Sequence, residues 1–125
     1  MPGAAAEDNV EKKVVLFAFR GDVSCFVHVL LNAIDYRERG YEAKVVLEGE
    51  ATKLVAVLSK AEHPMHGLFE KTKRQGLFAG ACRACSHQLG SQEACVAEGL
   101  TLLDDMHGHP GMGRYTEEGY TILIF

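Results

Sequence analysis

The chain has 125 residues, of which 47% are hydrophobic and 24% are charged, so it holds enough apolar material for one domain with its own core. The formal net charge is −4 and the lysines and arginines are scattered, which excludes the basic surface typical of a nucleic-acid-binding protein. No apolar run approaches the roughly 20 residues of a transmembrane helix, so we expect no membrane partner either.

The first residues, Met1 to Asn9, are small and polar, and they lack the basic start and long apolar stretch of a signal peptide. We therefore expect residues 1–11 to form a flexible tail and residues 12–125 to form the single domain. The expected location is the cytoplasm, where thiols stay reduced unless they are catalytic or bind a metal. The cysteines whose role has to be explained are Cys25, Cys82, Cys85 and Cys95.

Five short apolar segments have the length and composition of buried strands. They cover residues 13–19, 42–47, 77–81, 100–103 and 120–125. Helical spacing of apolar residues falls between them, over residues 23–38, 50–59, 66–74, 91–97 and 110–118. Regular alternation of strands and helices predicts a single three-layer α/β/α domain with a parallel, five-stranded, flavodoxin-like sheet in the order 2-1-3-4-5.

The first predicted helix begins after Asp22, a plausible N-cap, and its polar residues form one narrow stripe. That stripe consists of Ser24, His28, Asn32 and Asp35. A surface helix of a monomer normally has a broader polar face. We therefore expect this helix to be covered on more than one side, with a second copy of the chain as the additional cover.

The predicted strand order places the carboxyl ends of the first and third strands side by side, where open α/β sheets bind ligands. The first strand leads into Asp22, Ser24 and Cys25, and the third leads into Cys82, Arg83 and Cys85. The fourth strand would deliver Asp104 and Asp105 to the same edge. The sequence thus predicts one pocket built from distant segments.

Cys82 is the predicted nucleophile, because it stands at the end of a strand and the start of a helix. Unpaired amides and the helix dipole there stabilise a thiolate, which is the reactive form of cysteine. Arg83 would add positive charge and His87 would accept a proton. Cys85 would resolve an intermediate or share a bound sulfur.

The Cys82–Cys85 pair has three common interpretations: a redox dithiol, half of a zinc site, or two buried thiols. A zinc site would need His87 and Cys95, whose spacing is irregular, so no metal site is expected. The other loop histidines, including His107 and His109, stand beside glycine or proline and are expected in solvent. No phosphate-binding glycine motif occurs, so no cofactor is expected.

The apolar opening strand from Lys13 to Phe19, the cysteine-bearing Gly80–Cys85 segment and the closing Gly111–Phe125 segment together resemble the DsrE/DsrF-like family. The resemblance implies a sulfur carrier or sulfurtransferase that takes sulfane sulfur as a persulfide on Cys82 and passes it to a partner protein. It also implies a homo-oligomer, a trimer or a hexamer. Two alternatives stay open: a dithiol redox protein using Cys82 and Cys85, and a non-enzymatic oligomeric module that binds a small ligand.

Overall fold

The computed structural model describes residues 12–125, so the predicted tail at residues 1–11 lies outside the described residues. All five predicted strands are present, and the segment at residues 50–59 divides into a 3₁₀ helix and a short α-helix. The elements are β1 (Lys13–Ala18), α2 (Val23–Glu38), β2 (Glu42–Leu47), η1 (Gly49–Lys53), α3 (Leu54–Leu58), α4 (His66–Arg74), β3 (Phe78–Cys82), α5 (Arg83–Gln88), α6 (Gln92–Ala97), β4 (Leu102–Leu103), α7 (Gly113–Glu117) and β5 (Thr121–Ile124). Within residues 12–125, no helix combines the length and the apolar character needed to span a membrane.

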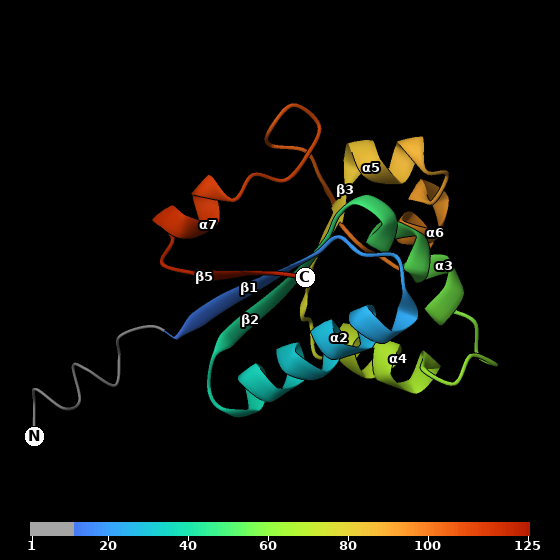
Figure 1. The fold of residues 1–125 in the computed structure, drawn as a ribbon, viewed down its shortest axis with the longest axis horizontal. Helices are drawn as coiled ribbons and strands as arrows, with labels where there is room; N and C mark the ends of the chain where they lie inside the picture. Colours follow the sequence, from blue (N-terminus) through green and yellow to red (C-terminus); the bar gives the residue numbers. More distant parts are fainter. Residues whose placement is uncertain (1–11) are drawn as a thin grey trace, which may run out of the picture.

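The five strands form one parallel sheet, as predicted, but their order is β4-β3-β2-β1-β5 (Figure 1). The predicted order 2-1-3-4-5 placed β3 beside β1, whereas β3 pairs with β2 and β1 pairs with β5. The physical reason lies in the crossovers. Right-handed crossovers that stay on one face of a sheet add each strand in the same direction, and only a crossover on the other face reverses it.

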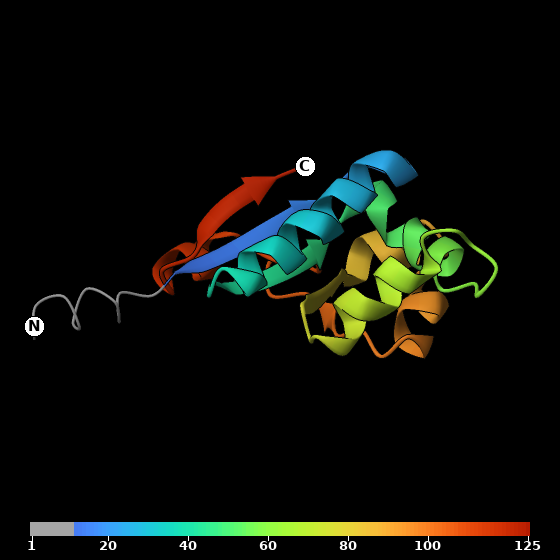
Figure 2. The same cartoon turned by 90° about the horizontal axis from the view of Figure 1, so that it is seen from below.

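The two faces of the sheet are covered unequally (Figures 1 and 2). Helices α2, α3, α4 and α6 pack against one face and contribute to the larger core. The other face carries α7, a helix of five residues, over a smaller core that includes Phe17 and Tyr115. The reversal of strand order therefore occurs where the chain passes along the thinly covered face, between β4 and β5.

Strand β1 is the centre of both cores, because alternate side chains enter opposite faces. Leu16 packs in the larger core and Phe17 in the smaller one, and neither is exposed to solvent. Burying a side chain of this kind stabilises the fold by roughly 1.5–3 kcal/mol. This double burial explains why β1 reads as a continuous apolar run.

Helix α2 begins as the sequence predicts, since the Asp22 carboxylate accepts a hydrogen bond from the backbone N–H of Cys25 at 3.1 Å. One face of α2 is buried, and the predicted polar stripe lies exposed on the other. Leu31, within that exposed face, is 48% exposed. Within residues 12–125, α2 is thus covered from one side.

Strand β3 contains a bulge that depends on Gly80. Val45 pairs with Phe78 and Val46 pairs with Gly80, so the intervening residue has no partner on β2. Gly80 has a φ of +153°, and a Cβ there would stand 2.2 Å from the carbonyl oxygen of Thr101. Only glycine allows this approach of the two backbones. Beyond the bulge, Ala81 pairs with Leu47 of β2, and Cys82 pairs with Leu103 of β4.

Candidate functional site

Four side chains from three separate segments converge at the carboxyl end of β3. Glu48 directly follows β2, Cys82 and Cys85 come from the junction of β3 and α5, and His109 lies in the loop after β4. Their carboxylate, sulfur and imidazole atoms all lie within 4.8 Å of one another. We call these four residues the thiol cluster.

Cys82 lies at the centre of the thiol cluster and has no exposed surface. It is the N-cap of α5, where its sulfur accepts a hydrogen bond from the backbone N–H of Cys85 at 3.3 Å. Its Sγ atom lies 3.0 Å from Nδ1 of His109. Removal from solvent raises the pKa of Cys82 to about 12, so the thiol is neutral at physiological pH. The structure therefore contradicts the prediction that the Cys82 side chain is exposed.

Cys85 is the accessible member of the pair. Its side chain is half-buried, and its Sγ atom lies 3.7 Å from the same Nδ1 atom of His109. The first turn of α5 directs both sulfur atoms toward one imidazole. A reagent from solvent therefore meets Cys85 before it meets Cys82.

His109 is held in place by a structured loop rather than lying in solvent as predicted. Met106 and His109 pair through two backbone hydrogen bonds of 2.7 and 2.9 Å. The carbonyl of Gly108 accepts a hydrogen bond from the backbone N–H of Ala84 at 2.9 Å, which attaches the loop to α5. The imidazole is consequently half-buried and its position relative to the sulfurs is fixed by backbone contacts.

Glu48 closes the thiol cluster from the side of β2, with only 7% of its surface exposed. Its backbone N–H donates to the carbonyl of Ala18 at 2.8 Å, which fixes the residue at the strand end. Burial raises the pKa of Glu48, and the charge of His109 and the Cys82 thiol act in the opposite direction. No ion pair formed among residues 12–125 includes Glu48. Nothing in the apolar pattern of the sequence singled out this residue.

The residues predicted to support the cysteines have other contacts. Arg83 forms an exposed ion pair with Asp104 at 3.1 Å, so its charge is matched by that carboxylate. Asp104 thus does reach the edge of the sheet near the cysteines, as predicted. His87 is exposed and lines a different surface depression, together with Ser86, Gly90, Gln92 and Glu93. The imidazole next to the thiols is that of His109.

Cys95 is not a member of the thiol cluster. It is fully buried in the larger core, where its sulfur donates to the carbonyl of Thr52 at 3.8 Å. Burial raises its pKa to about 11. The zinc set considered from the sequence, which joined His87 and Cys95 to the Cys82–Cys85 pair, is therefore not assembled.

The residues after β1 form a separate site, because β2 lies between β1 and β3. Asp22 accepts hydrogen bonds from the hydroxyl of Ser24 and the backbone of Cys25, and the carboxylate is thereby committed to capping α2. These bonds to Cys25 and Ser24 lower the pKa of Asp22 to about 2. The predicted convergence of these residues with Cys82 and Cys85 in one pocket is wrong.

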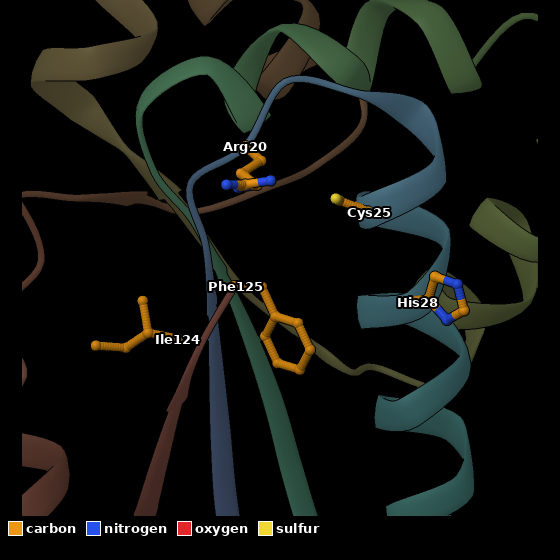
Figure 3. Close-up of a pocket in the computed structure, with 5 residues that line it drawn as sticks. All are labelled: Arg20, Cys25, His28, Ile124 and Phe125. Atoms are coloured by element: carbon orange, nitrogen blue, oxygen red, sulfur yellow. The ribbon is translucent and has the colours of Figure 1, made fainter.

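A pocket of about 320 Å³ lies where the strand order reverses, between β1, β5 and α2. It is lined by Arg20, Cys25, His28, Ile124 and Phe125. Figure 3 shows Phe125 turned toward α2, with Arg20 and Cys25 at the carboxyl end of β1. The rule that ligands bind at a reversal of strand order thus points to a real depression, but between β1 and β5 rather than between β1 and β3.

Comparisons with known proteins agree with the fold and identify relatives. No protein-family model matches the chain. A structure of a conserved protein of unknown function, BT1422 from Bacteroides thetaiotaomicron, has a TM-score of 0.68 at 20% identity and covers 91% of this chain and 95% of its own. An uncharacterized protein of Archaeoglobus fulgidus is 46% identical over 41 residues, which are 33% of this chain and 67% of that protein.

The uncharacterized protein MJ0733 of Methanocaldococcus jannaschii is similar over a longer stretch. It is 34% identical over 97 residues, which are 78% of this chain and 77% of MJ0733. Identity at this level over most of both chains indicates common descent. The chain belongs to the same protein family as MJ0733.

Proposed function

We propose that the protein is a sulfur carrier of the DsrE/DsrF-like kind, which accepts sulfane sulfur as a persulfide and passes it to a partner protein. The observation that supports this proposal is the half-exposed thiol of Cys85 beside an imidazole and a second thiol. A persulfide carrier needs an accessible cysteine and a group that takes its proton. The greater exposure of the Cys85 thiol supports placing the sulfur on Cys85 rather than on Cys82.

The proposed loading step transfers one sulfur atom without a net change in oxidation state. The Cys85 proton passes to Nδ1 of His109, and the resulting thiolate attacks the outer sulfur of a donor persulfide. A new sulfur–sulfur bond forms on Cys85, the bond in the donor breaks, and the donor leaves as a thiolate. In the unloading step, a thiolate of the acceptor attacks the outer sulfur, and Cys85 is released as a thiolate.

Cys82 and His109 have distinct roles in this proposal. His109 accepts and returns the proton, because its Nδ1 atom lies closest to both sulfurs. Cys82 stays a neutral thiol, whose S–H is a weak hydrogen-bond donor for the charged persulfide next to it. Glu48 stabilises the imidazolium that forms when His109 takes the proton.

Mass spectrometry of the reduced, metal-free protein tests this assignment. After incubation with polysulfide, the intact chain should gain the mass of one sulfur atom, and peptide mapping should place it on Cys85. The Cys85→Ser variant should lose the gain, whereas Cys82→Ser and the control Cys25→Ser should keep it. Undiminished loading of Cys85→Ser would overturn the assignment.

A dithiol redox function is the second candidate, and the closeness of the two sulfur atoms within the thiol cluster favours it. In this case Cys82 would attack the inner sulfur of the Cys85 persulfide, form a disulfide and release hydrosulfide. The measured product would then be a protein that has lost two hydrogen atoms and gained no sulfur. That product is abolished equally by Cys82→Ser and Cys85→Ser.

We also propose that the protein works as a homo-oligomer in the cytoplasm, in which α2 contributes to the subunit contact. The support is the exposure of Leu31, an apolar side chain next to the polar stripe of α2. Replacing Leu31 with glutamate should lower the mass measured by light scattering. An unchanged mass would exclude this face of α2 as the contact.

A further inference from the structure

The thiol cluster presents four different donor atoms to one point in space. Two sulfurs, an imidazole nitrogen and a carboxylate oxygen come from residues that the fold brings together from the ends of β2 and β3 and the loop after β4. Four such donor atoms around one point could coordinate a metal ion, whether or not the protein transfers sulfur.

The distances between these atoms are close to those of a tetrahedral metal site. Bonds of about 2.3 Å to sulfur and 2.0–2.1 Å to nitrogen or oxygen place tetrahedral ligand atoms roughly 3.3 to 3.8 Å apart. The atoms of the thiol cluster lie within 4.8 Å of one another, and the Cys85 sulfur stands 3.7 Å from Nδ1 of His109. Since no two of these atoms lie more than 4.8 Å apart, side-chain rotations that bring them closer by at most about 1.5 Å would complete the coordination.

The electrostatic setting also fits a cation. Glu48 is more than nine-tenths buried, forms no ion pair within residues 12–125 and lies beside the half-buried His109. A carboxylate in such a place is costly unless a positive charge compensates it. Cys82 is buried beside it, and a metal ion would stabilise its thiolate as well.

We infer that the thiol cluster is a binding site for one divalent transition-metal ion of borderline softness, with zinc as the best match. Two thiolates and an imidazole select such an ion over magnesium or calcium, which prefer oxygen ligands. Cys85 and His109 are half-buried, so the ion has a path from solvent. Binding replaces the protons of Cys82 and Cys85 by two metal–sulfur bonds and releases both protons to water.

The consequence is a competition at the same sulfur atoms. An ion held by both thiolates leaves no free thiolate to attack a donor, so metal binding suppresses sulfur acceptance. This regulatory statement rests on the proposed sulfur-carrier function, whereas the metal site itself does not.

Cobalt(II) titration of the reduced full-length chain tests the site, because cobalt reports thiolate ligands by a sulfur-to-metal charge-transfer absorption. One equivalent should saturate the band, and zinc should displace it. The Cys82→Ser and Cys85→Ser variants should lose most of the band. His109→Ala and Glu48→Gln should keep a weakened band and bind at least tenfold more weakly, as is typical for loss of a contributing group at a metal site.

Matched controls separate the site from general effects. Cys25→Ser, His107→Ala and Glu50→Gln change the same residue types outside the cluster and should titrate as the unchanged protein does. Circular dichroism of each variant establishes that it is folded, and Glu48→Gln preserves the shape of the residue it replaces. A missing band in the unchanged protein, or a band that Cys82→Ser and Cys85→Ser both retain, would overturn the inference.

Two combinations of results distinguish this inference from the proposed function. Sulfur loading of the metal-free protein without a cobalt band removes the metal site and leaves the carrier function intact. A cobalt band without sulfur loading removes the carrier function and leaves the metal site intact. If both occur, saturation with zinc should reduce loading at least tenfold, and loading that zinc does not affect would refute the competition.

Discussion

Nδ1 of His109 lies 3.0 Å from the sulfur of Cys82, although the two residues are 27 positions apart in the sequence. The contact joins the end of β3 to the loop that follows β4. Strand β4 pairs with β3 over only two residues, so the ladder alone anchors that loop weakly. The interaction of an imidazole with two thiols therefore helps to hold the loop, and the loop in turn encloses Cys82.

The different exposure of the four cysteines predicts an order of chemical labelling. In the native protein, iodoacetamide should modify Cys85 and Cys25, which are half-buried, well before Cys82 and Cys95, which are buried. The raised pKa of Cys82 and Cys95 adds to the difference, because the thiolate is the reactive form. Peptide mapping after timed labelling measures the order.

Labelling in denaturant is the control for this experiment. With the fold lost, all four cysteines should react at similar rates. Native labelling of Cys82 as rapid as that of Cys85 would contradict the structure.

The lowered pKa of Asp22 predicts that its contribution to stability depends on pH. Its pKa falls from an ordinary value of 3.8 to about 2 in the folded chain, through its hydrogen bonds to Cys25 and Ser24. The stabilisation is therefore complete above about pH 4 and is lost as the pH falls toward 2. Asp22→Ala should lower the thermal midpoint at pH 7, and the difference from the unchanged protein should disappear in acid.

The Asp22→Asn variant isolates the contribution of the charge. Asparagine still caps a helix but does not titrate, so the difference in stability between Asp22→Asn and Asp22→Ala should not change between pH 4 and pH 2. A constant difference between the unchanged protein and Asp22→Ala across that range would contradict this account.

Replacing Gly80 with alanine should strongly reduce the stability of the protein. The Cβ of Gly80→Ala would collide with the backbone of Thr101, and the backbone angle disfavours any residue with a side chain. We expect a loss of about 2–5 kcal/mol in the free energy of unfolding, measured with urea. Gly67→Ala is the matched control: a Cβ there meets nothing within 4 Å, and alanine in α4 should stabilise by about 0.5–1 kcal/mol.

Substitutions of Tyr115 measure how strongly α7 is held against the sheet. Its ring packs edge-on against Phe17 at 5.7 Å and Tyr120 at 5.5 Å, and only 1% of its surface is exposed. Tyr115→Ala should destabilise the protein by about 3–5 kcal/mol and speed the labelling of Cys82. Tyr115→Phe removes a hydroxyl whose contact is with Arg114 at 3.3 Å, and should cost less than about 1.5 kcal/mol.

The secondary structure was predictable because each element has a local cause. The apolar run of β1 and the Asp22 cap of α2 both lie within a few residues of the element that they define. The strand order was not predictable in the same way. It depends on which face each crossover takes, and the shortness of α7 gives no sign in the sequence that it covers the opposite face alone.

Only the part of the candidate site that lies close together in the sequence, the Cys82–Cys85 pair, could be predicted. The spacing of Cys82 and Cys85 is visible in the chain, but their partners come from the strands on either side of β3. If β1 is taken as the neighbour of β3, Asp22 and Cys25 are the expected partners of the two cysteines. Because β2 is the actual neighbour, the partner is Glu48. One error in strand order therefore replaced one set of partners by another.

The loop that carries His109 continues directly into α7, which provides the helical cover of the second face. Detachment of residues 104–117 would separate the imidazole from both sulfurs while the remaining strands and helices stay folded, as in the partial unfolding that hydrogen exchange detects. A ligand that joins His109 to the sulfurs would slow that exchange. Binding of a ligand to the sulfurs of Cys82 and Cys85 would therefore also change how often the loop and α7 detach from the sheet.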